Sequence, residues 1–98
     1  MPSYPKHITH RSEAWRRAVA SLPCQLCGIE GQSQAAHLNQ GKAMGRKTHD
    51  AWCAAVCYTC HSRIDQGKDL DREDRRRLLE TAVLLTIAEL AIRGLVKP

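Results

Sequence analysis

The chain is poor in aromatic side chains, because it contains no phenylalanine and only two tryptophans and two tyrosines among 98 residues. A domain of this size buries too little apolar surface to be more than marginally stable through packing alone. Leucine, isoleucine, valine and alanine must therefore supply most of the core. We treat residues 1–98 as one domain and expect a structural metal to contribute part of its stability.

Long apolar runs are also missing. No stretch approaches the roughly 18 apolar residues of a membrane-spanning helix, and no apolar targeting segment is evident. We therefore expect no membrane partner and a cytoplasmic location, where thiols are kept reduced and disulfides are rare.

Cysteine is well represented, with five residues in the chain. Four of them form two Cys-x-x-Cys pairs, Cys24/Cys27 and Cys57/Cys60. A disulfide framework would leave Cys53 over and does not suit a reducing compartment. Two such pairs are typical of a tetrahedral zinc site, and Gly28 after the first pair suits the positive φ of a zinc knuckle. We predict one structural Zn²⁺ bound by the four paired thiolates.

Acidic residues are fewer than basic ones. Ten Asp and Glu stand against 15 Lys and Arg, which gives a formal net charge of +5 and a pI near 9.2. Nucleic acid is the usual polyanionic partner of a basic zinc protein, although many small domains carry such a charge for solubility alone. The charge therefore favours DNA as a partner without requiring it.

Capping residues and apolar periodicity predict the order of the elements. Ser12 is a good N-cap for a first helix, Pro23 ends that helix, and Gly94 ends the last one. The predicted parts are an extended arm over 1–11, a helix over 12–22, a zinc core over 24–66 and a C-terminal helix over 71–93. The predicted elements of the core are strands over 34–38 and 52–56 and a helix over 57–66. The expected fold class is a small zinc-stabilised α+β domain with a treble-clef or ββα-metal core.

The predicted C-terminal helix is apolar around more than half of its circumference. Its first turns carry several arginines, whereas leucine, isoleucine and valine dominate the remainder. One small zinc core can hardly cover so much apolar surface. We therefore predict that part of this helix packs on a second copy of the chain to form a homodimer.

A second site is indicated by one histidine on a strand and two polar residues on the helix that follows the hairpin. His37 lies near the end of the first predicted strand, and His61 and Asp65 are four residues apart on one helical face. We expect the hairpin to bring all three together. A lone strand histidine is more often structural. An imidazole and a carboxylate on one open helical face nevertheless suit a divalent ion that also binds phosphate and water.

The loop over residues 39–50 combines two glycines, Gly41 and Gly45, with three cations. Such a composition permits close approach of the backbone to phosphate, but a flexible surface turn has the same composition. Both interpretations stay open from these residues alone.

Several segments resemble the zinc-stabilised ββα-metal branch of the His-Asn-His (HNH) endonuclease superfamily, and within it the small nucleases encoded by prophages. The segments are Cys24-x-x-Cys27, Ala36-His37-Leu38, Gly41–Asp50 and Cys57-x-x-Cys60-His61-x-x-x-Asp65. The resemblance covers residues 24–66 and implies a metal-dependent DNA endonuclease, that is, a hydrolase acting on phosphodiester bonds.

The resemblance assigns the role of general base to His37. It assigns a second, catalytic divalent cation, such as Mg²⁺ or Mn²⁺, to His61 and Asp65. His37 would take a proton from water, which attacks a DNA phosphodiester in line and leaves 5′-phosphate and 3′-hydroxyl ends. The loop residues that would position the DNA backbone, through salt-sensitive contacts, are Lys42, Arg46 and Lys47.

The sequence departs from the family pattern at two positions. Ala36 stands where a metal ligand is common, and Trp52 stands where an asparagine usually orients the base. Asp50 is the first choice to fill either gap, ahead of His49 and Asn39, because its carboxylate can reach from the loop into the cleft.

Two further functions remain open. One is a non-catalytic zinc module that binds DNA or a recombination or replication protein, with His61 and Asp65 serving only to support the zinc cage. The other is an obligate dimeric scaffold dominated by the last helix.

Overall fold

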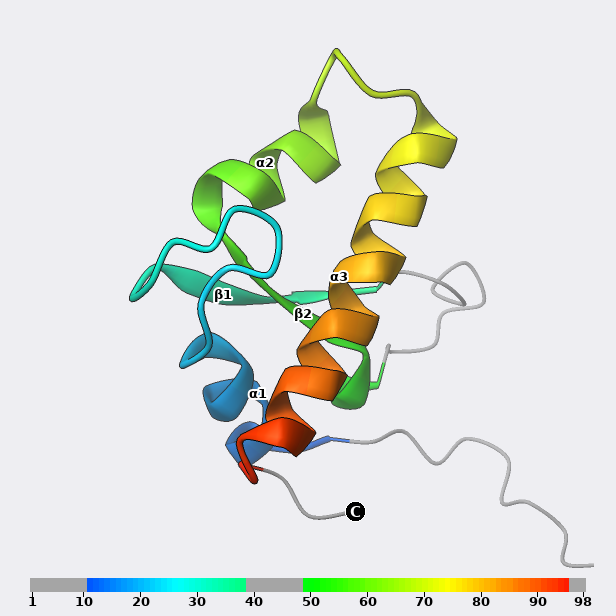
Figure 1. Cartoon of the computed structure of the whole chain (residues 1–98). Coiled ribbons are helices and arrows are strands. Elements are labelled where there is room, and N and C mark those ends of the chain that lie inside the picture. Colours follow the sequence, from blue (N-terminus) through cyan, green and yellow to red (C-terminus); the bar gives the residue numbers. More distant parts are fainter. Residues whose placement is uncertain (1–10, 39–48, 96–98) are drawn as a thin grey trace, which may run out of the picture.

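The computed structural model describes residues 11–38 and 49–95 of the chain (Figure 1). The elements in chain order are α1 (Glu13–Ala20), β1 (Ser33–His37), the short 3-10 helix η2 (Asp50–Trp52), β2 (Cys53–Cys57), α2 (Tyr58–Gln66) and α3 (Arg72–Ile92). This part of the chain forms a small α+β domain with one two-stranded sheet, which confirms the fold class at this level. None of its helices is both long and apolar enough to cross a membrane.

Short polar side chains define where the helices begin and end. The Ser12 hydroxyl accepts a hydrogen bond from the Trp15 amide at 3.0 Å, which confirms the predicted N-cap of α1. The helix ends at Ala20, before the predicted residue 22, because the chain turns at Ser21, whose hydroxyl donates to the Ala18 carbonyl at 2.6 Å. Asp71 caps α3 by accepting from the Asp74 amide at 2.8 Å.

The two strands form the predicted antiparallel hairpin, with each strand displaced by one residue from its expected limits. His37 lies opposite Cys53 at one end, and Ser33 lies opposite Cys57 at the other. Trp52 belongs to η2, and its carbonyl accepts a hydrogen bond from the Leu38 amide at 2.9 Å. The two ends of the hairpin, His37–Cys53 and Ser33–Cys57, therefore carry different side chains.

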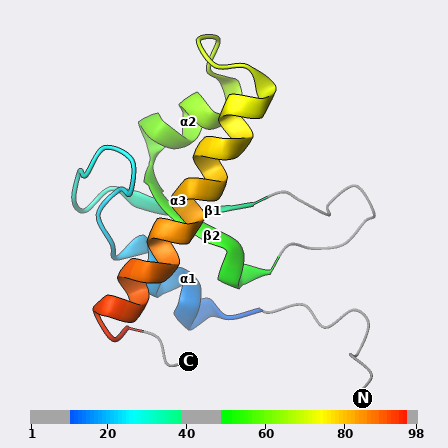
Figure 2. The same ribbon diagram turned by 45° about the vertical axis from the view of Figure 1, so that its right-hand side comes forward.

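Helices cover both faces of this sheet (Figure 2). Because side chains alternate along a strand, Ala54 and Val56 face one side of β2, and Cys53 and Ala55 face the other. The residues around the first pair are Ala36 from β1, Ile64 from α2 and Leu79, Ala82 and Val83 from α3. The residues around the second pair are Val19 and Leu22 near α1, Ala35 from β1 and Leu90 from α3. All five residues of β2 are consequently buried.

Backbone groups on the edge of β2 that does not face β1 also have hydrogen-bond partners. The Ala55 amide donates to the hydroxyl of Thr86 at 2.9 Å, and the Ala55 carbonyl accepts from the Gln25 amide at 2.8 Å. Thr86 in turn donates to the Ala82 carbonyl at 2.7 Å. Helix α3 and the turn that contains Cys24 and Cys27 thereby replace a third strand, so the short sheet exposes no unpaired backbone at this position.

Candidate functional site

The four paired cysteines converge at one end of the hairpin. Cys24 and Cys27 belong to the turn before β1, Cys57 is the last residue of β2, and Cys60 lies in α2. Their sulfur atoms all lie within 4.8 Å of one another, and Cys27 Sγ is 3.7 Å from Cys57 Sγ. A tetrahedral zinc with Zn–S bonds of about 2.3 Å requires sulfurs about 3.8 Å apart. The cluster could therefore hold a structural metal such as zinc, as the spacing predicts.

The backbone of the knuckle supports these sulfurs. Gly28 has a φ of 83°, which bears out the expectation of a left-handed residue after the first pair. Its amide donates to the Cys24 carbonyl at 2.8 Å, while the Cys27 amide points at Cys24 Sγ at 3.5 Å. The turn thus directs N–H groups toward the sulfurs, and such contacts stabilise thiolates.

The charges of the thiols call for a cation at the centre of the cluster. Burial raises the pKa of Cys24, but backbone amides of Cys27, Cys57 and Leu26 outweigh it and lower that pKa to about 6. Burial and the neighbouring thiols raise the pKa of Cys60. The first thiolate therefore forms readily, whereas four adjacent thiolates need a metal to offset their repulsion.

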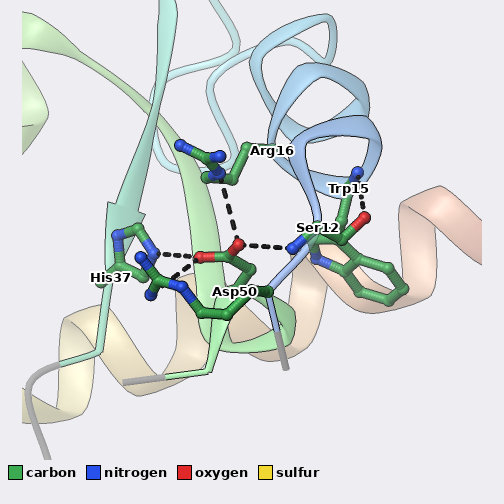
Figure 3. A network of polar contacts seen from close by, with 6 residues as sticks. Ser12, Trp15, Arg16, His37 and Asp50 are labelled. Carbon is green, nitrogen blue, oxygen red and sulfur yellow. Dashed lines mark hydrogen bonds and ion pairs between the residues drawn. The ribbon is translucent and has the colours of Figure 1, made fainter. Parts of the chain in front are cut away.

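A buried carboxylate occupies the opposite end of the hairpin (Figure 3). Asp50 begins η2, is 0% exposed, and accepts hydrogen bonds from His37 Nε2 at 2.9 Å and from the Ser12 amide at 2.6 Å. Arg16 Nε lies 3.3 Å and Arg11 Nη1 lies 3.6 Å from its oxygens. This one side chain joins the end of β1 to the start of α1.

The surroundings of Asp50 keep it ionised. Burial raises the pKa of its carboxyl group, but the hydrogen bonds from His37 and Ser12 and the charges of Arg11 and Arg16 lower it below its usual value. A carboxylate accepts hydrogen bonds, so His37 Nε2 carries a proton. In the neutral ring the second nitrogen, Nδ1, is then the basic atom. The His37 side chain is 33% exposed, so this site can meet solvent or a ligand.

Cys53 completes a group of three possible metal ligands with His37 and Asp50, since their ligand atoms all lie within 4.8 Å of one another. Two observations oppose a cation there. Two guanidinium groups already neutralise Asp50, and burial, followed by the charge of Asp50, raises the pKa of Cys53 to about 12. A protonated thiol and a neutralised carboxylate are poor ligands, so this end of the hairpin suits proton transfer better than metal binding.

His61 and Asp65 share one face of α2, as predicted, with 3.3 Å between His61 Nε2 and Asp65 Oδ2. His61 Nδ1 also lies 3.0 Å from the Gln34 side-chain oxygen. Gln34 and His37 are three residues apart in β1, and an odd separation places two side chains on opposite faces of a strand. The structure therefore does not gather His37, His61 and Asp65 into one cluster, because the hairpin lies between them.

The remaining predicted site residues have different outcomes. Ala36 is buried in the core on the α2 side of the sheet, and Trp52 packs edge to face on His49 with ring centroids 4.6 Å apart. Asp50, the first choice to fill these gaps, contacts His37 directly. The predicted DNA-binding residues, and Asn39, lie outside the described residues; they are Lys42, Arg46 and Lys47.

Arg11, Arg16 and the Ser12 amide are the part of the site that sequence reasoning missed, and Arg11 was expected only as a solvated residue of the N-terminal arm. Ser12 was predicted only as a helix cap, and Arg16 has no neighbour in the sequence that indicates a role. The common signal is one helical turn: the cap and a residue four positions later lie on the same side of the helix start. Only the fold places that side against Asp50.

Comparisons with known proteins bear on the fold and the family. A solved structure of a presumed bacteriophage protein from Escherichia coli str. K-12 substr. MG1655 is similar, with 22% sequence identity and a TM-score of 0.63. The similarity covers 83% of this chain and 100% of that chain, and it shows the fold alone. No curated protein matches the sequence significantly. A family model described as a protein of unknown function, DUF968, matches residues 2–78, and the chain therefore belongs to the DUF968 family.

Proposed function

We propose that the chain is a metal-dependent, HNH-type DNA endonuclease of phage or prophage origin, with His37 as its general base. The observation that carries the proposal is the 2.9 Å contact between His37 Nε2 and the buried carboxylate of Asp50. An ionised carboxylate that fixes one nitrogen of a partly exposed histidine leaves the other nitrogen directed and basic.

In the proposed reaction, His37 Nδ1 takes a proton from water, and Asp50 stabilises the imidazolium that forms. The hydroxide attacks phosphorus in line, a P–O bond forms, and the bond to the 3′ oxygen breaks. The departing oxygen takes up a proton from solvent, which leaves 5′-phosphate and 3′-hydroxyl ends. Asp50 keeps its negative charge throughout, because the hydrogen bonds from His37 and the Ser12 amide, together with the charges of Arg11 and Arg16, hold its pKa low.

Positive charge beside the base supports a phosphate substrate. The Arg11 and Arg16 side chains are 51% and 46% exposed although both contact Asp50. A guanidinium has five N–H donors, and Arg16 approaches the carboxylate through Nε, so its terminal N–H groups can reach a phosphate oxygen. Contacts of this kind position a DNA backbone without reading its sequence.

Two metals belong to the proposal. Zinc on the four cysteines would tie the knuckle to the junction of β2 and α2, which is a treble-clef arrangement. The resemblance assigns the catalytic divalent ion to His61 and Asp65, whose side chains are 33% and 52% exposed. That pair lies across the hairpin from His37, so an ion bound there could not act on the phosphate that is attacked by water activated by His37. The divalent ion of the proposal would therefore bind together with the substrate phosphate on the His37 face, where it would polarise a phosphoryl oxygen and offset charge on the leaving group.

One observation favours the alternative, a non-catalytic zinc module that binds DNA or a recombination or replication protein. His61 is already engaged by Gln34 and Asp65, and it lies on the other face of β1 from His37. In that case the contacts of His61 serve only to hold α2 on the hairpin. The nuclease proposal is preferred because it also explains why a buried carboxylate is directed at an exposed histidine.

The test is cleavage of supercoiled plasmid in the presence of Mg²⁺, Mn²⁺ or Ni²⁺. We expect nicking by the wild-type protein and a loss of about 10²- to 10⁴-fold in His37→Ala, with bound zinc unchanged. Arg17→Ala serves as the control, because Arg17 is exposed on the same helix as Arg16 and pairs with Glu13 instead of Asp50. If no ion supports nicking but the protein retards DNA on a gel, the zinc module is correct. A scaffold would do neither.

A further inference from the structure

Helix α3 carries two separate apolar surfaces. One faces the sheet and consists of Leu79, Ala82, Val83, Thr86 and Leu90, all buried. The other, which we name the outer stripe, lies on the opposite side of the helix and consists of Leu84, Leu85, Ala88, Ala91, Ile92 and Leu95, all exposed. Leu84, at the margin of the stripe, also lines an open groove with Leu38 and Trp52. Leu84 and Ile92 are 68% and 78% exposed. In both views of the ribbon no described element covers this side of α3 (Figures 1 and 2).

The outer stripe has the geometry of a helix-packing seam. Leu85, Ala88 and Ile92 follow one another within α3 at spacings of three and four residues, and such spacing keeps them on one face. Gly94, with a φ of 66°, lets the Leu95 amide donate to the Leu90 carbonyl at 3.0 Å, so Leu95 is held against the helix end. From Leu84 to Ile92 the helical part of the seam is about 12 Å long.

The order of side-chain sizes along the seam is nearly symmetric about its centre. Leu84 and Leu85 lie at one end, Ile92 and Leu95 lie at the other, and the small Ala88 lies between them. An antiparallel copy of the same helix would therefore place bulky residues against bulky ones and let the two backbones approach at Ala88. The stripe is thus complementary to itself in one orientation.

Charge does not oppose this orientation. The arginines in the first turns of α3 have acidic neighbours: Arg76 pairs with Glu80 at 3.1 Å, and Arg77 pairs with Glu73 at 2.8 Å. No ionisable side chain belongs to the outer stripe, so packing two stripes together buries no charge from it. The order of side-chain sizes is therefore what selects the antiparallel orientation.

We propose that the outer stripe is the contact surface of a homodimer in which two copies of α3 pack antiparallel, with Leu85 against Ile92 of the partner subunit. Burial of these apolar side chains drives the association. The seam is short beside the roughly 1,200–2,000 Å² of a standard interface, so the dimer is expected to dissociate in the micromolar range. This dimer does not depend on the proposed nuclease activity.

The first experiment is sedimentation equilibrium of the zinc-loaded full chain from micromolar to several hundred micromolar concentration. The expected mass rises to twice the 11.0 kDa of one chain. Leu85→Lys and Ile92→Glu should each weaken the dimer by about tenfold or more, because each buries an unpaired charge. Ile29→Lys, at an exposed apolar residue of the knuckle, should leave it unchanged. A monomer at every concentration, or a dimer that ignores both stripe variants, overturns the proposal.

The second experiment decides the orientation. Mixing Leu85→Lys chains with Ile92→Glu chains should restore a two-chain complex, because antiparallel packing sets the introduced ammonium against the introduced carboxylate. Parallel packing would pair neither. Both substituted side chains are exposed, so circular dichroism and zinc content should match the wild type. If the single variants dissociate and the mixture does not recover, the antiparallel arrangement is wrong.

Discussion

The two ends of the β1–β2 hairpin handle negative charge in opposite ways. At the Ser33–Cys57 end, four sulfurs converge closely enough to hold a cation from outside the chain. At the His37–Cys53 end, one carboxylate is buried and the chain itself supplies the compensating groups, namely His37, Arg11 and Arg16. The first end could therefore hold a structural metal, whereas at the second end the chain's own groups surround the carboxylate and a histidine stays partly exposed.

The largest expected effect comes from breaking the metal end. Cys57→Ser should release zinc and abolish the cooperative melting transition, because structural zinc sites couple on the order of 10 kcal/mol of binding free energy to folding. Asp65→Ala is the matched control: Asp65 lies on α2 with a half-exposed side chain, so its loss should leave the melting temperature nearly unchanged. Calorimetry with zinc analysis measures both. Equal losses in melting temperature would contradict two separate sites.

The next effect comes from neutralising the carboxylate at the other end. Asp50→Asn should lower the free energy of unfolding by about 2 kcal/mol, because a buried charged acceptor loses its strong hydrogen bonds. Asp69→Asn provides the comparison, since Asp69 also pairs with an arginine, Arg63, but on the exposed surface. Urea unfolding followed by circular dichroism should show a clear shift for the first variant and almost none for the second. Similar shifts for the two variants would show that burial of Asp50 has no energetic role.

A smaller effect concerns acid. The folded-state pKa of Asp50 is lowered, so its stabilisation is complete above the unfolded value of about 3.9 and is lost as pH falls through the folded-state value. Thiolate protonation also releases zinc in acid, and this affects wild type and Asp50→Asn alike. The difference in stability between the two proteins should therefore be constant near neutral pH and shrink below about pH 4. A difference that grows on acidification would reverse the assigned sign.

The smallest expected effect tests whether Arg16, at the His37–Cys53 end of the hairpin, contacts the phosphates of DNA. Arg16→Ala should reduce the slope of DNA affinity against salt by about 1, whereas Arg17→Ala should leave it unchanged. The two arginines are neighbours on α1, but only Arg16 contacts Asp50. Gel retardation at several salt concentrations gives both slopes. If the slope falls by the same amount in both variants, the arginines of α1 attract DNA only through their positive charge, and Arg16 has no specific phosphate contact beside His37.

Local chemistry explains how much of this protein could be predicted. The Cys-x-x-Cys spacing, the caps at Ser12 and Asp71 and the glycine at position 28 each act within a few residues, and the structure confirms them. The hairpin was predicted with each strand one residue out of place, because propensity does not specify where η2 takes over from β2. Such limits depend on tertiary contacts such as the Leu38–Trp52 hydrogen bond.

The relation between His37 and the pair His61 and Asp65 could not be predicted in the same way. The sequence shows that each residue carries useful chemistry, but the face on which His37 lies depends on the strand register, and one residue of register reverses it. The same holds for Asp50, whose contact with the Ser12 amide joins residues 38 positions apart. No local pattern encodes a contact of that range.

The amino-acid sequence by itself determined the two thiol pairs, the order and type of the elements and the excess of apolar surface on the last helix, since each follows from spacing or composition. Tertiary structure alone decided that Asp50 is buried against His37, that His61 lies across the sheet, and that α3 has an inner and an outer apolar surface. The physical reason is that burial and pairing are properties of surfaces brought together by packing, and packing depends on the whole chain at once.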